Sequence, residues 1–376
     1  MIVNSITILK CNTPFEIGFH SPQRARRQAE SMIVILQFNN GIAGYGESAP
    51  RAYVTGESPY TVAHIIKNHF SKILFDTEIS SVSDIEDTLH FLEEECWNAN
   101  IKAYNSALGA IDIALLDALG KFQKTTIDKF LYPIIQNNLP RSLSIPLLPP
   151  AKIRDFCDPL KSLELESFKI LMSEGENDNI ERVQLIRSLF GDNVKIRIEA
   201  NGKWSRDQAI STIEKLKKFN ISGVEQPVAG NDIEGLRKIR NITGIPVIVD
   251  ESLITLADAK HLIENEACDI INIKISKCGG IIKCKQIADL ARSRNILCQV
   301  GSHVGETDIL NKAGEYFAMT VSNLFSFEGF SSLLFGNIWQ RNDKAKQLKI
   351  KTNISSFGFG SDISDQLLEQ IYTIIP

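Results

Sequence analysis

Short runs rich in β-branched residues alternate with longer stretches of helical apolar spacing in the second half of the chain. We predict eight strands, at residues 143–147, 168–172, 194–199, 223–225, 246–250, 270–273, 297–300 and 323–327. Helical periodicity lies between them, clearest at 177–190, 205–219 and 255–265. Strands that alternate with helices indicate parallel βαβ units. Eight such units favour a closed (β/α)-barrel over an open doubly wound sheet, because no G-x-G-x-x-G follows the first strand.

The first part of the chain has a different pattern, which is typical of an α+β domain. A β-rich run at 31–38, an Asn-Asn-Gly turn and a return run at 42–47 predict a hairpin. Apolar residues recur at helical spacing over 104–119, and Gly120 follows as a stop signal. Residues 14–30 and 48–58 show no clear period, so we predict two long loops there.

Composition narrows the class of protein. The chain has 376 residues, of which 43% are hydrophobic and 23% charged, and a formal net charge of −4. This balance is ordinary for a globular protein and gives no reason to expect nucleic acid or a membrane as partner. Seven scattered cysteines without a C-x-x-C pair are typical of reduced thiols. With no signal-peptide pattern at the start, we expect a cytoplasmic protein.

Charged residues end four consecutive predicted strands. Glu199, Glu225, Asp250 and Lys274 follow one another at intervals of 26, 25 and 24 residues, which is one βα unit each. A parallel barrel brings strand ends to one rim, so these side chains should converge. Three converging carboxylates repel each other unless a cation lies among them. Oxygen ligands suit Mg²⁺, with Mn²⁺ as an alternative. For any single acid, a helix cap or a pairing with a rim lysine is the competing explanation.

Several motifs together resemble one known family. They are Ile-Glu-Ala-Asn-Gly-Lys-Trp at 198–204, Val-Glu-Gln-Pro at 224–227, Val-Asp-Glu-Ser at 249–252, Asn-Ile-Lys at 272–274 with Gly-Gly-Ile at 279–281, Gly-Tyr-Gly-Glu at 44–47, Gly-Ser at 301–302, and the helix around 110–115. The set resembles the enolase superfamily, in the subgroup of muconate cycloisomerase, o-succinylbenzoate synthase and the dipeptide epimerases.

The resemblance implies a fold and a chemistry. It implies an α+β capping domain, at 1–135 with 345–376 packing back on it, over a modified barrel at 136–344. It also implies one Mg²⁺ held by Glu199, Glu225 and Asp250, a homo-oligomer, and a small carboxylate as substrate. The expected reaction is removal of the proton next to the carboxylate by Lys274, while the metal stabilises the charge that develops.

Three positions depart from the subgroup's pattern. The usual Lys-x-Lys of the second strand is Lys169-Ile170-Leu171, so Leu171 stands where the second lysine belongs, and we expect only a bulge to turn Lys169 inward. Glu199 replaces the usual aspartate, and the extra methylene moves the carboxylate by about 1.3–1.5 Å. His303 replaces a common methionine and is a further candidate acid or base, or a hydrogen-bonded loop residue.

Other candidate residues would contact the substrate. Ser302 matches a position that binds the substrate carboxylate. Glu328 follows the eighth strand, where the dipeptide epimerases usually have Asp-x-Asp. Phe19 and Arg24 lie in the segment that closes over the barrel mouth in the family.

Three functional hypotheses follow. With Leu171 unable to transfer a proton, the leading one is a one-base lyase or cycloisomerase in which Lys274 is the base and Lys169 assists. The first alternative is an amino-acid or dipeptide racemase or epimerase, with Lys169 as the base opposite Lys274. The second is a barrel that has lost catalysis and serves as a binding protein.

Overall fold

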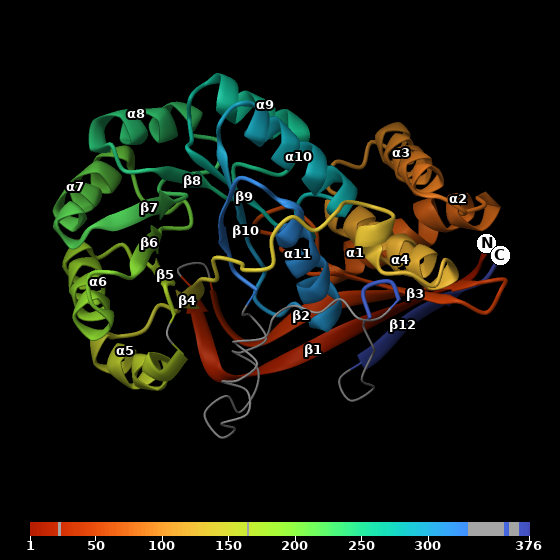
Figure 1. Ribbon diagram of the computed structural model, residues 1–376, viewed down its shortest axis with the longest axis horizontal. Helices are drawn as coiled ribbons and strands as arrows, with labels where there is room; N and C mark the ends of the chain where they lie inside the picture. The colour runs from red at the N-terminus through yellow and green to blue at the C-terminus, as the bar shows by residue number, and fades with distance from the viewer. Residues whose placement is uncertain (22–23, 164, 330–356, 361–367) are drawn as a thin grey trace.

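The structure is a computed structural model that describes residues 1–21, 24–163, 165–329, 357–360 and 368–376. For 13–21, 24–27, 29, 150, 159, 162–163 and 368–370 the backbone alone is described. These residues form two sheets, one of four strands and one of eight. Figure 1 shows the larger sheet curved inside a ring of helices, with the smaller sheet and its helices beside it. Within the described residues, no helix is both long enough and apolar enough to cross a membrane.

The smaller, antiparallel sheet has the strand order β12-β1-β2-β3. Its strands are β1 (Val3–Ser21), β2 (Arg24–Phe38), β3 (Ala43–Ser48) and β12 (Leu368–Ile374). Because β12 pairs with β1, the end of the chain completes the capping sheet, as predicted. Its helical elements are α1 (Pro59–Ile65), the π-helical η1 (Ile66–Phe70), α2 (Ser71–Asp76), α3 (Val82–Asn98) and α4 (Asn105–Phe122).

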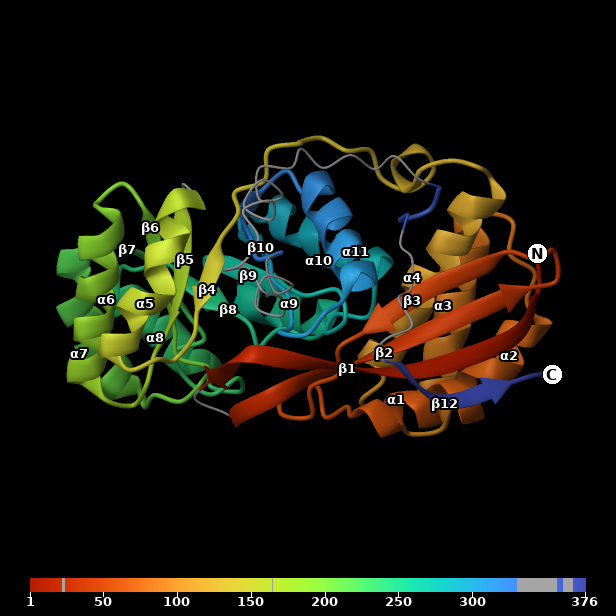
Figure 2. The same ribbon diagram turned by 90° about the horizontal axis from the view of Figure 1, so that it is seen from below.

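The prediction of a loop over residues 14–30 is wrong. The backbone there continues β1 and β2, with Pro14 opposite Gln28 and Ser21 opposite Arg24. Both views of the ribbon show this hairpin reaching from the cap to the barrel (Figures 1 and 2). Cross-strand backbone hydrogen bonds do not require an apolar period, so the hydrophobic pattern carries no signal for this extension.

The larger sheet is parallel throughout and runs in sequence order from β4 to β11. Its strands are β4 (Leu143–Ile145), β5 (Ser167–Leu171), β6 (Lys195–Glu199), β7 (Ile221–Glu225), β8 (Val247–Val249), β9 (Ile270–Ile273), β10 (Leu297–Val300) and β11 (Leu324–Phe327). The sheet closes on itself where the Ser142 amide donates to the Phe327 carbonyl at 2.9 Å. The predicted closed barrel is therefore confirmed.

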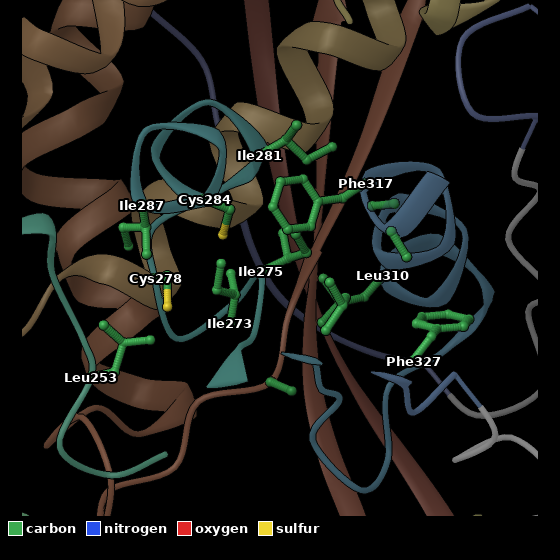
Figure 3. Packing of buried hydrophobic residues seen from close by; sticks show 14 of the residues in the cluster. Leu253, Ile273, Ile275, Cys278, Ile281, Cys284, Ile287, Leu310, Phe317 and Phe327 are labelled. Carbon is green, nitrogen blue, oxygen red and sulfur yellow. The ribbon is translucent and has the colours of Figure 1, made fainter. Parts of the chain in front are cut away.

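Helices connect successive barrel strands and cover the outside of the sheet. They are α5 (Pro150–Cys157), α6 (Glu176–Phe190), α7 (Arg206–Leu216), α8 (Ile233–Thr243), α9 (Leu256–Glu264), α10 (Ile281–Ser293) and α11 (Asp308–Thr320), with short 3₁₀ turns at Ile127–Lys129, Asp158–Leu163 and Lys217–Phe219. Figure 3 shows Ile273 and Ile275, on either side of Lys274, among apolar side chains of α10 and α11. This packing fixes the backbone that carries Lys274.

Helix α4 joins the cap to the barrel. Gly44 and Gly46 let β3 approach α4 so closely that a Cβ at Gly46 would lie 1.8 Å from the Ala110 carbonyl oxygen. On the barrel side, the buried Asp112 carboxylate accepts the amide of Ile281 at the start of α10, at 2.5 Å. The glycine pair that supports the family resemblance therefore has a packing role.

Candidate active site

The three predicted metal-binding acids lie at the ends of β6, β7 and β8, on one rim of the barrel. Glu199 and Glu225 are paired across β6 and β7, and both contact the Lys169 ammonium, at 2.9 and 3.2 Å. One oxygen each of Glu199, Asp250 and Glu251 lie within 4.8 Å of one another. Convergence at the rim is as expected, but Glu251 is a site acid that we did not predict.

Glu225 is surrounded by donors. Its Oε1 accepts from Asn272 Nδ2 at 2.8 Å, and its Oε2 accepts from Gln299 Nε2 at 3.0 Å, in addition to the Lys169 contact. Its role as a metal ligand stays a prediction. Glu251 competes with it for the third position, because Glu251 is the acid whose oxygen lies near those of Glu199 and Asp250.

The carboxylates fit a hard divalent cation. Burial raises the pKa of Glu199 to about 8, and burial together with the nearby Asp250 charge raises the pKa of Glu251 to about 7. These groups resist ionisation when only protein surrounds them, and a cation would remove that penalty. Crowded oxygen donors without sulfur or imidazole are the set that Mg²⁺ or Mn²⁺ prefers.

Lys169 points into the barrel without a bulge, so the expectation that only a bulge would turn it inward is wrong. Strand β5 pairs regularly with β4 and β6, and Lys169 contacts Glu199, Glu225 and Glu328. Leu171, two residues later, lies on the same face and is 3% exposed. The lysine therefore lies one layer below the leucine, and its long side chain reaches the carboxylates.

Lys274 follows β9 and contacts the Asp250 carboxylate at 2.6 Å. The second Asp250 oxygen contacts Lys277, also at 2.6 Å, and Lys277 donates further to the Asn272 carbonyl at 2.9 Å. Burial alone would raise the pKa of Asp250, but the two lysines outweigh it and hold that pKa well below its usual value. Lys277 is fully buried and is a site residue that no sequence motif marks.

The Glu328 carboxylate contacts two cationic side chains. Its Oε2 accepts from Lys169 at 3.0 Å, and its Oε1 accepts from Arg197 at 2.6 Å. Gln299 adds a longer contact of 3.3 Å. A substrate group that bound Glu328, as predicted, would therefore compete with Lys169 and Arg197 for this carboxylate. Arg197 was not predicted as a site residue, although the strict alternation of Lys-Ile-Arg-Ile-Glu places it on the same face as Glu199.

The remaining predicted residues lie around the mouth. His303 is buried beyond β10. Ser302 is half-buried, and its hydroxyl donates to the Glu328 carbonyl at 2.9 Å, so it is placed beside the site. Phe19 and Arg24 lie in the hairpin of β1 and β2, but their side chains are outside what the structure describes. Their roles stay predictions.

Comparison with known proteins gives the family. Residues 155–363 match the enolase C-terminal domain-like family, and residues 3–131 match the mandelate racemase/muconate lactonizing enzyme N-terminal domain. The chain belongs to the enolase superfamily. The resemblance inferred from the strand-end motifs is confirmed.

Similar proteins include racemases and epimerases. An L-Ala-D/L-Glu epimerase of Clostridium acetobutylicum is 31% identical over 304 residues, covering 80% of this chain and 82% of that protein. The N-succinyl Arg/Lys racemase of Bacillus cereus has a structure with a TM-score of 0.88 at 26% identity, with all of both chains covered. A dipeptide epimerase of Cytophaga hutchinsonii, solved with Mg and D-Ala-L-Val, has a TM-score of 0.87 at 26% identity, again with all of both chains covered.

A muconate lactonizing enzyme of Pseudomonas fluorescens shares the fold, with a TM-score of 0.82, but is only 23% identical over 89% of each chain. The more similar proteins are isomerases of amino-acid derivatives. They favour the epimerase alternative over the lyase or cycloisomerase that the sequence led us to expect.

Proposed function

We propose that this enzyme racemises or epimerises an amino-acid derivative by moving the proton on the carbon next to its carboxylate. The observation that carries the proposal is the placement of two lysines. In the closed barrel, β5 with Lys169 and β9 with Lys274 are separated by three strands on one side, so they stand on opposite walls. Inversion of a carbon centre requires proton transfer at two opposite faces.

The acids between the two lysines define where the reacting carbon would lie. Lys169 contacts Glu199 and Lys274 contacts Asp250, while oxygens of these two acids lie within 4.8 Å of each other. Bound there, Mg²⁺ or Mn²⁺ would stabilise the negative charge that develops on the substrate carboxylate. The substrate's α-carbon would then have one lysine on each side.

The two lysines have different surroundings and therefore different proposed roles. Lys274 contacts the carboxylate of a predicted metal ligand, Asp250, at 2.6 Å, and we assign it proton removal. Lys169 also contacts Glu328, which lies outside the predicted ligand set and faces Arg197 on its other oxygen. Glu328 favours a positive charge on Lys169, so we assign Lys169 proton delivery to the opposite face.

Leu171 favours a second candidate function. The apolar Leu171 side chain is 3% exposed and lies on the same face of β5 as Lys169, one layer nearer the barrel mouth. If Leu171 keeps Lys169 from the substrate, Lys274 acts alone, and the reaction is a β-elimination or cycloisomerisation. Lys169 would then only stabilise negative charge.

Deuterium exchange separates these candidates. N-acyl amino acids and L-dipeptides are incubated with enzyme and Mg²⁺ in D₂O and followed by proton NMR and chiral chromatography. Inversion with deuterium at the α-carbon supports the epimerase, whereas loss of substrate to an unsaturated or cyclised acid supports the one-base reaction.

Variants test the assigned roles. Lys274→Ala should abolish exchange, and Lys169→Met should retain exchange without inversion. Lys260→Ala, an exposed lysine on α9, is the matched control and should behave as wild type. Normal exchange in Lys274→Ala would refute the proposal.

We also propose that the enzyme works as a cytoplasmic homo-oligomer on a small carboxylate. The support is composition and family resemblance. Light scattering after gel filtration tests the assembly, and a mass equal to one chain of 41.9 kDa would refute it.

A further inference from the structure

His303 is a buried polar side chain whose ring is not satisfied by the protein. The residue is 5% exposed, and its amide donates to Glu306 Oε1 at 2.5 Å. Among the described residues, neither ring nitrogen has a hydrogen-bond partner. A buried polar group left unpaired destabilises the folded protein, because it has lost its hydrogen bonds to water without replacing them. Such a ring beside an active site indicates a contact that a bound molecule would complete.

The ring lies on the Lys274 side of the mouth. It follows β10, which pairs with β9, the strand that leads to Lys274. Arg51, from the loop after β3, donates to the carbonyl of Val304 at 2.6 Å, next to His303. Burial, together with the charges of Lys274 and Arg51, holds the pKa of His303 well below its usual value. The neutral ring therefore offers one N–H donor and one acceptor nitrogen.

The charges around His303 favour an oxygen acceptor over an ammonium. Arg51 and Lys277 are cations that act on the ring, as is Lys274 while it carries a proton, and Asp250 is the opposing acid. Both Asp250 oxygens already contact lysines. Glu306 already accepts the His303 amide, and burial raises the pKa of Glu306 to about 8, which disfavours its charged form. A substrate ammonium at this place would meet more positive than negative charge.

We propose that His303 donates a hydrogen bond to the acyl carbonyl oxygen of an α-N-acylated amino acid, and that the cations around it disfavour an acyl group with a free ammonium. This inference rests on the proposed function, because it presumes that the substrate's α-carbon lies beside Lys274. It makes His303 a residue that determines specificity by binding, instead of the acid or base considered from the sequence.

Matched compounds test the preference. N-propionyl-L-amino acids are compared with L-alanyl dipeptides of the same side chain, which differ only by the ammonium group. Binding with Mg²⁺ present is measured by calorimetry, and α-proton exchange is measured in D₂O. The wild-type enzyme should prefer the propionyl compound at least about tenfold in Kd and in kcat/KM. Equal or tighter binding of the dipeptide, or no binding of either, would overturn the inference.

Variants of His303 assign the preference to its ring. His303→Met removes the donor at similar volume and should raise KM about tenfold while kcat changes less than about threefold. His303→Gln keeps an N–H donor and should recover part of the loss. His261→Met, an exposed histidine on α9, is the matched control and should behave as wild type. An unchanged KM in His303→Met, or a loss confined to kcat, contradicts the binding role.

A measurement on the wild-type protein covers the case in which His303→Met does not fold. Nitrogen-15 NMR of the histidine rings should show a shift of the His303 signal when the propionyl compound binds. Failure of the proposed function is distinguishable, since it appears as no exchange with any compound while the binding preference persists.

Discussion

Removing one partner of the buried ion pair between Arg197 and Glu328 should strongly destabilise the barrel, because it leaves the other charge buried and unpaired. The side chains are 1% and 5% exposed, and Arg197 Nη2 lies 2.6 Å from Glu328 Oε1. Glu328→Gln keeps the shape but removes the charge. Lys169 would still contact Glu199 and Glu225, so Arg197 is the cation left without a carboxylate. Breaking a buried pair in this way costs about 3–5 kcal/mol.

Urea unfolding measures this loss without screening the charges. Far-ultraviolet circular dichroism reports on the whole chain, and tryptophan fluorescence, to which Trp204 in the loop after β6 contributes as a buried residue, gives a second probe of unfolding. The control is Glu264→Gln, which breaks an exposed pair with Lys260 at 3.9 Å. That change should cost less than about 0.5 kcal/mol.

Removing both charges should restore stability. Arg197→Met with Glu328→Leu replaces the pair by apolar side chains of similar volume, and we expect unfolding within about 1 kcal/mol of wild type or a more stable protein. Two results would refute the reasoning. One is a loss below about 1 kcal/mol in Glu328→Gln, and the other is a double variant no more stable than the single one.

Three further predictions concern packing, pH and metal. Gly46→Ala should destabilise the protein by about 1–3 kcal/mol in urea unfolding, because the added Cβ would lie 1.8 Å from the Ala110 carbonyl oxygen. The control is Gly314→Ala, whose added Cβ would have its nearest neighbouring atom at 4.0 Å, and it should be neutral or stabilising. Equal effects of the two substitutions would contradict this prediction. Burial raises the pKa of Asp112 to about 7, so its contribution to stability is present below about pH 4 and is lost as the pH rises through 7. The fall in unfolding free energy from pH 5 to pH 8 should therefore be smaller in Asp112→Asn than in the wild-type protein. Parallel curves of unfolding free energy against pH for the two proteins would contradict this prediction. Glu225→Gln should weaken Mg²⁺ binding in calorimetry by at least about tenfold and Glu251→Gln by less, because Glu225 is fully buried and Glu251 only partly; the reverse order would make Glu251 the third ligand.

Local periodicity was sufficient to predict the barrel. Each of its eight strands is a short apolar run, most of them with β-branched residues, next to a helical pattern, and the strands lie within a few residues of the predicted ranges. The gathering of Glu199, Glu225, Asp250 and Lys274 at one rim could also be predicted from their spacing in the sequence, because parallel strands bring their carboxyl ends to one rim. These features depend on neighbours along the chain, which a sequence displays directly.

Contacts between distant segments were decided by the tertiary structure. The hairpin of β1 and β2 extends because its two backbones satisfy each other, without an apolar period to announce it. Alternation could place Lys169 and Arg197 on the inner face, but only closure of the barrel brings Glu328, more than 130 residues beyond Arg197, between them. Which carboxylate meets which cation depends on how buried charges are shared in three dimensions, and no local pattern records that.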